Sequence, residues 1–179
     1  MKVAIAGGTG LVGQKLCHVL KARGDEVIVL TREESKFEED IQYVNWLGEE
    51  KPDQALEGID AFVNLAGVSL NDGRWTEERK EAIYTSRMNT TDEVLRIIES
   101  LQTKPQVLIN ASAVGIYPTS TSTVYTEQSN EFATDFLGKV VVDWEQKANR
   151  ATALGVRVCL ARLGVVLEKE VGALPLIVL

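Results

Sequence analysis

The stretch Lys2–Gly13, KVAIAGGTGLVG, decides the fold of this 179-residue chain. Its first part, Lys2–Ala6, is a short continuous apolar run, which predicts a strand buried on both faces. Apolar residues at helical spacing then predict a helix over Leu11–Ala22, which ends before Gly24. A strand, a glycine-rich turn and a helix in this order are typical of the first unit of a parallel α/β sheet.

The glycines of this turn fit two overlapping patterns, G-x-G-x-x-G at positions 8, 10 and 13 and G-x-x-G-x-x-G at positions 7, 10 and 13. Glycine lets the backbone turn tightly and approach a pyrophosphate, and the free N–H groups at the helix start stabilise its negative charge. A glycine-rich turn without a ligand is the alternative. The residues predicted to contact a dinucleotide here are Gly7, Thr9, Gly10, Leu11, Val12 and Gly13.

The end of the second predicted strand, Glu26–Leu30, bears on the choice of dinucleotide. An NAD site usually has an acidic residue about 20 positions after the glycines, which binds the ribose 2′-hydroxyl. Here the strand is followed by Thr31 and Arg32. The arginine suits a 2′-phosphate, so we expect Thr31 and Arg32 to contact NADP. Glu33 and Glu34 leave NAD open, and Arg32 is alternatively a solvated loop residue.

The rest of the chain continues the alternation of strands and helices. An Asn-Asp-Gly sequence at 71–73 indicates a turn, and Thr76 is a suitable cap for the helix that follows. Strands are predicted over Ile41–Trp46, Asp60–Leu65, Gln106–Ala111 and Val156–Leu163, and helices over Thr76–Leu101 and Glu131–Leu154. We therefore predict a single α/β domain, residues 1–179, with a doubly wound parallel sheet in the order 3-2-1-4-5-6.

Composition excludes several classes of partner. The chain is 45% apolar and 25% charged, with a net charge of −7, which argues against a nucleic-acid backbone or an anionic membrane. No apolar stretch is long enough for a signal peptide or a membrane span. Cys17 and Cys159 are interpreted as reduced, buried residues of a cytoplasmic protein. His18 is the only histidine, and no metal site is expected.

Three motifs occur in the order expected of a known superfamily: GGTGLVG, NLAG (Asn64–Gly67) and ASAVGIY (Ala111–Tyr117). On these residues the chain resembles the extended, sugar-nucleotide-epimerase-like branch of the short-chain dehydrogenase/reductases. More narrowly, it resembles the NAD(P)-dependent epimerase-like proteins labelled cell-division inhibitors. The motifs for this are RWTEERKEAIYTSR (Arg74–Arg87), DFLGKVVVDWE (Asp135–Glu145) and RLGVVL (Arg162–Leu167).

The resemblance implies a Rossmann-like fold that binds NADP, with the backbone of Leu65, Ala66 and Gly67 along the cofactor. Arg87 falls where many members have an asparagine, and it is expected to be a pocket residue or, alternatively, part of a surface salt bridge. Members are normally longer than this chain, and the ending GALPLIVL is apolar. We therefore expect that a C-terminal, substrate-binding portion is missing. Members often dimerise through two helices, which correspond here to about Trp75–Leu101 and Glu131–Leu154; the oligomeric state is left open, with a homodimer as one option.

The catalytic residues of the superfamily are only partly matched. Redox members use a serine, a tyrosine and a lysine four positions after the tyrosine, and no Tyr-x-x-x-Lys occurs in this sequence. Phe136 lies near the tyrosine position, Val140 or Val141 near the lysine position, and Lys139 is displaced. Ser112 matches the family serine and is alternatively a strand-end hydroxyl that caps the backbone. It is also expected to contact the cofactor.

Tyr117 follows the same strand and is a candidate substitute acid, although packing or stacking is the alternative. Three hypotheses follow. The first is an NADP-dependent epimerase or oxidoreductase acting on an unknown small molecule, such as a sugar nucleotide or carbonyl compound, through Ser112 and Tyr117. The second is a catalytically inactive NADP-binding regulatory or scaffold protein. A third is a truncated chain that folds without any activity of its own.

Overall fold

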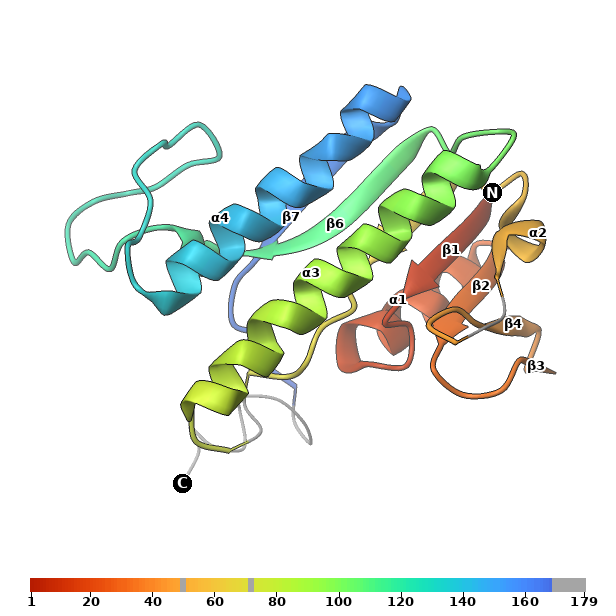
Figure 1. The fold of residues 1–179 in the computed structure, drawn as a ribbon, viewed down its shortest axis with the longest axis horizontal. Helices are drawn as coiled ribbons and strands as arrows, with labels where there is room; N and C mark the ends of the chain where they lie inside the picture. Colours follow the sequence, from red (N-terminus) through yellow and green to blue (C-terminus); the bar gives the residue numbers. More distant parts are fainter. Residues whose placement is uncertain (49–50, 71–72, 169–179) are drawn as a thin grey trace.

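The computed structural model describes residues 1–48, 51–70 and 73–168. Across these residues a seven-stranded sheet has the order β3-β4-β2-β1-β5-β6-β7 (Figure 1). Every pairing is parallel except that of β3 with β4. The strands are β1 (Lys2–Ala6), β2 (Glu26–Thr31), β3 (Lys36–Glu38), β4 (Ile41–Asn45), β5 (Ala61–Asn64), β6 (Val107–Ala113) and β7 (Arg157–Leu163).

Helices cover both faces of this sheet. They are α1 (Leu11–Ala22), α2 (Asp53–Leu56), α3 (Glu77–Ser100) and α4 (Phe136–Asn149), with 3-10 turns η1 (Val114–Ile116) and η2 (Arg150–Leu154). Figure 1 shows α3 and α4 side by side over one face, with α1 on the other. A hydrophobic core lies on each face of the sheet. Strand β1 contributes to both, because successive side chains of a strand point to opposite faces. Ala4 and Ala6 pack with the α3 core, whereas Val3 and Ile5 pack with Cys17 of α1.

The predicted fold class and strand order are confirmed. The six predicted strands correspond to β1, β2, β4, β5, β6 and β7, and they stand in the order 3-2-1-4-5-6. Strand β3 was not predicted. It forms an antiparallel hairpin with β4 at the sheet edge, through a turn in which Glu39 and Asp40 have positive φ. The apolar ending at 172–179 and two residues of the predicted 71–73 turn lie outside the described residues.

The helix predicted over Glu131–Leu154 is too long at its start. Helix α4 begins at Phe136, where the Asp135 carboxylate accepts a hydrogen bond of 2.8 Å from the Gly138 N–H and caps the helix. The segment before it does not continue the helix, because the Ala133 N–H donates to the Ile116 carbonyl of η1 at 2.8 Å. By contrast, the predicted Thr76 cap of α3 is confirmed, since its hydroxyl accepts from the Arg79 N–H.

The two cysteines differ in exposure, which corrects one prediction. Cys17 is buried on the face of α1 that packs against the sheet, as expected, whereas Cys159 is exposed. Cys159 pairs in register with Ile109, and Ile109 packs at the border of the α1 core. Strand β7 is the last strand of the sheet, so Cys159 lies at the edge of that face.

We expect thiol reagents to separate these cysteines. Cys159 should be alkylated readily in the folded protein. Cys17 should react only after unfolding, because it is shielded and because burial raises the pKa of its thiol. Mass spectrometry of peptides after brief treatment with iodoacetamide measures both reactions. Equal labelling of the two residues under native conditions would contradict this assignment.

Candidate functional site

The turn between β1 and α1 lies directly against the end of β5. The Gly10 N–H donates to the Gly7 carbonyl at 3.1 Å, which closes the turn. Gly7 has a φ of +79°, and a Cβ atom on it would lie 2.7 Å from the carbonyl carbon of Leu65. Only glycine fits at this position, because both the left-handed backbone and the backbone contact exclude a side chain.

The other glycines of the turn have different roles. A Cβ atom on Gly13 would lie 2.3 Å from the Gly7 carbonyl oxygen, so Gly13 lets α1 pack against the turn. A Cβ atom on Gly10 would meet only that oxygen, at 3.4 Å, which is an ordinary contact. Gly10 is exposed and stands at the N-cap of α1 in an extended conformation. Its surface is therefore open to a ligand.

Within residues 1–48, 51–70 and 73–168, no side chain caps the N-terminus of α1. Gly10 provides no side-chain cap, and the first turn contains no acidic residue. The first N–H groups of a helix have no partners within the helix, and together with the helix dipole they favour an anion. Thr9, Leu11 and Val12 lie in the same segment. These residues fit a cofactor diphosphate, which needs close backbone approach and converging N–H groups.

The end of β2 lies beside this turn, because β1 and β2 are parallel and Ala6 pairs with Leu30. Thr31 is buried, and its hydroxyl accepts a hydrogen bond of 3.1 Å from the Glu33 N–H. The side chain of Arg32 is exposed. Its carbonyl is held by the Asn45 side-chain amide at 3.1 Å. Arg32 is thus presented to solvent at the edge of the sheet where the glycine turn lies.

A buried amide pair fixes the end of β5. The Asn64 side-chain amide donates to the Asn110 side-chain oxygen at 2.7 Å and to the Thr91 hydroxyl at 3.2 Å. The Asn64 side-chain oxygen accepts from the Ala66 N–H at 3.2 Å. This network orients the backbone of Leu65 and Ala66, against which Gly7 rests. We did not predict this role. Asn64 ends β5 and Asn110 lies inside β6, and an asparagine in an apolar strand is a signal for a buried, hydrogen-bonded side chain.

Arg87 reaches the same edge of the sheet from α3. Its Nη1 donates to the carbonyl oxygens of Val68, at 3.2 Å, and Ile83, at 2.9 Å. The guanidinium carbon lies 5.2 Å from the centre of the Trp144 ring. It would lie 3.2 Å from a Cβ atom on Gly67. Arg87 therefore stands between the segment after β5 and helix α4.

Ser112 and Tyr117 are joined through a buried ion pair. The Ser112 hydroxyl donates to Glu145, whose side chain is 8% exposed. Arg162 donates to both carboxylate oxygens of Glu145, at 2.8 Å each, and its Nη1 donates to the Tyr117 hydroxyl. Mainly because of Glu145, the pKa of Arg162 is raised. The two predicted catalytic residues therefore belong to one network, although Ser112 is only 3% exposed.

Tyr117 faces an open cleft beside η1. Its hydroxyl donates to the Thr126 carbonyl at 2.7 Å, and its ring stacks on Tyr125 with centroids 5.0 Å apart. The cleft has a volume of about 480 Å³. Besides these tyrosines, it is lined by Val114, Gly115, Pro118, Thr119, Ser120 and Thr123. Aromatic faces and hydroxyl groups in one cleft suit a small polar ligand.

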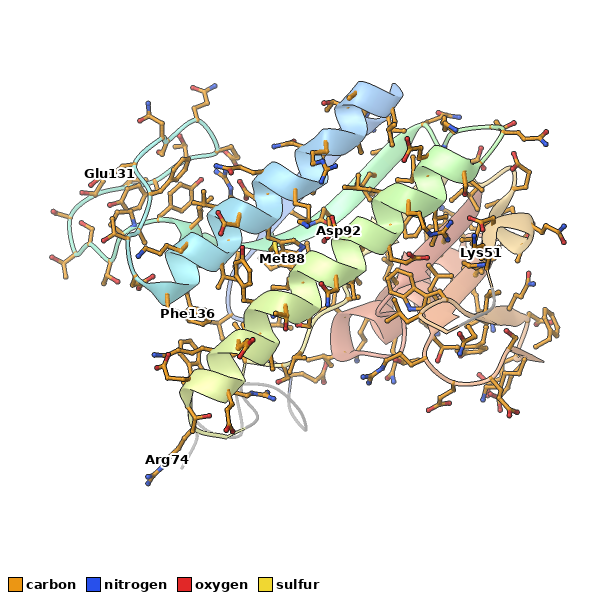
Figure 2. All side chains as sticks on the ribbon, in the orientation of Figure 1. Lys51, Arg74, Met88, Asp92, Glu131 and Phe136 are labelled. Atoms are coloured by element: carbon orange, nitrogen blue, oxygen red, sulfur yellow. The ribbon has the colours of Figure 1, made fainter. Side chains whose placement is uncertain are left out.

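The family positions on α4 supply no substitute for the missing tyrosine and lysine. Val140 and Val141 are buried, and Lys139 is exposed. Phe136 contacts Trp75 edge to face at 5.9 Å. Figure 2 shows Phe136 at the start of α4 and Met88 on the part of α3 next to α4. Met88 packs there with Trp144, so this region is structural core.

Among the described residues no group of three or more histidine, cysteine, aspartate or glutamate side chains has a metal-binding arrangement. No helix within 1–48, 51–70 and 73–168 combines the length and the apolar character that a bilayer span requires.

This architecture defines a class of protein. A parallel sheet whose order reverses between β1 and β5, with a glycine turn at the carboxyl end of β1, is that of Rossmann-like dinucleotide-binding proteins. The model of the NAD dependent epimerase/dehydratase family matches residues 3–167. The chain therefore belongs to this family, as its motifs indicated.

Relatives and solved structures agree with this assignment. The chain is 45% identical to the epimerase family protein YfhF of Bacillus subtilis, over all of this chain and 59% of YfhF. The crystal structure of human epimerase family protein SDR39U1 (isoform 2) with NADPH is 29% identical, with a TM-score of 0.82 over 99% of this chain and 58% of that one.

A nucleoside-diphosphate sugar epimerase from Corynebacterium glutamicum is 35% identical, with a TM-score of 0.81 over 99% of this chain and 36% of that one. The chain thus spans less than two thirds of the length of these proteins.

Proposed function

We propose that this chain is the NADP-binding part of an epimerase-like oxidoreductase that acts on an unknown small molecule, such as a sugar nucleotide or carbonyl compound. The observation that carries the proposal is the glycine turn, which opens on the uncapped start of α1 beside Arg32. The human relative with NADPH supports the same cofactor. A dinucleotide would lie across the carboxyl ends of β1, β2 and β5.

The residues that would hold the cofactor come from the glycine turn and the start of α1, the end of β2, the segment after β5, α3 and β6. Backbone N–H groups at the start of α1 would bind the diphosphate, and Arg32 would bind the 2′-phosphate. The nicotinamide, when bound, supplies the hydride chemistry of the family. The full set that we assign is Gly7, Thr9, Gly10, Leu11, Val12, Gly13, Thr31, Arg32, Leu65, Ala66, Gly67, Arg87 and Ser112.

Tyr117 would act as the proton donor or acceptor. Its hydroxyl accepts a hydrogen bond from Arg162 and donates its own proton to the Thr126 carbonyl. A substrate oxygen that replaced this carbonyl would receive the proton. Ser112 would act through Glu145, because its hydroxyl is engaged there.

A second candidate function is NADP binding without turnover, as in a regulatory or scaffold protein. The buried state of Ser112 and its hydrogen bond to Glu145 favour this candidate. The lack of a Tyr-x-x-x-Lys pair favours it as well.

Two measurements separate these candidates. NADPH fluorescence titration tests cofactor binding, and oxidation of NADPH with a panel of carbonyl compounds and sugar nucleotides tests turnover. An enzyme should lose turnover in a Tyr117→Phe variant and keep NADPH affinity. Binding without turnover in the wild-type full-length protein supports the second candidate. Absence of binding below about millimolar NADPH, an affinity of roughly −4 kcal/mol, would refute both.

We expect Arg32→Gln to weaken NADPH binding at least about ten-fold and to leave NADH binding almost unchanged. A charge-assisted contact contributes about 1.5–3 kcal/mol, and 1.4 kcal/mol corresponds to ten-fold. Parallel titrations of both cofactors measure this. Arg150→Gln is the control. Arg150 is exposed and directly follows α4, before the start of β7, whereas the glycine turn lies at the carboxyl ends of the strands. An equal loss of affinity for NADH, or no loss of affinity for NADPH, would rule out the contact between Arg32 and the 2′-phosphate.

A further inference from the structure

The guanidinium of Arg87 has hydrogen-bonding capacity that the described residues leave unused. Nη1 donates to two backbone carbonyls, those of Val68 and Ile83. Within residues 1–48, 51–70 and 73–168, Nε and Nη2 donate to no acceptor, and no carboxylate pairs with this arginine. Arg162, by contrast, is paired with Glu145.

Arg87 is also partly withdrawn from water. It is enclosed by Gly67 on one side and by the ring of Trp144 on the other. Burial lowers the pKa of Arg87, and no neighbouring carboxylate opposes this effect in the described residues. Burying a cation without a counter-charge costs free energy, and binding of an anion would offset this cost.

The location of Arg87 identifies what reaches it. Gly67 follows Leu65 and Ala66, whose backbone contacts Gly7 of the glycine turn. On the other side Trp144 packs with Ala111, which precedes Ser112 at the end of β6. The guanidinium therefore stands at the carboxyl ends of β5 and β6, between the cofactor turn and the serine network. Ligands of open α/β sheets bind at this edge.

We propose that Arg87 is an oxyanion receptor that binds a phosphate or carboxylate group through Nε and Nη2. These two nitrogens form the planar fork that matches two oxygens of such a group. Gly67 leaves room for the approach, because a side chain there would press on the guanidinium. The anion belongs either to the cofactor or to an acidic substrate. The first of these alternatives rests on the proposed function.

The test measures binding of inorganic phosphate to the wild-type chain, Arg87→Gln, Arg87→Lys and the charge-matched control Arg150→Gln. Binding is followed by the rise in thermal unfolding temperature with phosphate concentration. We expect Arg87→Gln to weaken phosphate binding about ten-fold and Arg150→Gln to leave it unchanged. Arg87→Lys should bind with intermediate affinity, since it keeps the charge without the fork. This variant also keeps the test decisive if Arg87→Gln does not fold.

Two further arms identify the source of the anion. If NADPH displaces phosphate and binds Arg87→Gln about ten-fold more weakly, the anion is a cofactor phosphate. If phosphate binds together with NADPH, and NADPH affinity does not depend on Arg87, the anion belongs to an acidic substrate. The same comparison is made in the Gly10→Val background. If Arg87→Gln still weakens phosphate binding there, the anion site at Arg87 is independent of the glycine turn. Equal phosphate affinity in the wild type and Arg87→Gln, or no phosphate binding to the wild type, would overturn the proposal.

Discussion

Replacing Gly10 with valine is expected to abolish NADPH binding while the protein stays folded. A Cβ atom at this position has only an ordinary contact, 3.4 Å from the Gly7 oxygen, and the backbone is extended. The free energy of unfolding should change by less than about 1 kcal/mol, the range of N-cap effects. The two extra methyl groups would occupy the space that the diphosphate needs. Affinity should fall at least about 100-fold.

Fluorescence titration with NADPH measures the loss, and thermal unfolding confirms the fold. Gly10→Ala is the matched control, since it adds one carbon and should reduce affinity less than valine does. Gly13→Ala gives the opposite pattern. It should destabilise the fold itself, because its Cβ atom would lie 2.3 Å from a backbone oxygen. Wild-type NADPH affinity in Gly10→Val would show that the cofactor does not bind at this turn.

Replacing Glu145 with alanine is expected to lower the free energy of unfolding by about 3 kcal/mol. Glu145 accepts two hydrogen bonds from Arg162 and one from Ser112. Its loss leaves the arginine, whose side chain is 19% exposed, without its counter-charge. Urea denaturation followed by circular dichroism measures the change. The effect should exceed that of most single substitutions.

Asp143→Ala is the control for this experiment. Asp143 lies two residues earlier on the same helix, and its carboxylate accepts a hydrogen bond from the exposed Tyr84 hydroxyl. We expect a loss within about 1 kcal/mol, as for other exposed polar contacts. Similar losses in the two variants would contradict the structural role of the Glu145–Arg162 pair.

The fold could be predicted where local pattern and global order agree. The run Lys2–Ala6, the glycines after it and the spacing of α1 each determine a local conformation, and together they imply a parallel sheet. The prediction was wrong where tertiary contacts decide. The start of α4 depends on the Asp135 cap and on the bond from Ala133 to Ile116, which no periodicity reveals.

The same limit applies to the candidate site. The glycine turn was predictable because its backbone needs residues without a side chain. Ser112 was proposed because it matches the family serine, and Tyr117 because it follows the same strand. Their partners Glu145 and Arg162 were missed, since these residues come from α4 and β7 and meet only when the helix packs over β6. Arg162 carries a signal in hindsight, because a charged residue within an apolar strand needs a partner.

The structure of the chain with NADPH bound tests the central claim most directly. We predict that the diphosphate lies against the start of α1, within hydrogen-bond distance of the N–H groups of Leu11 and Val12. The 2′-phosphate should lie at Arg32, and the nicotinamide should point toward the end of β6. A cofactor bound away from the glycine turn, or no bound cofactor at saturating NADPH, would contradict the account.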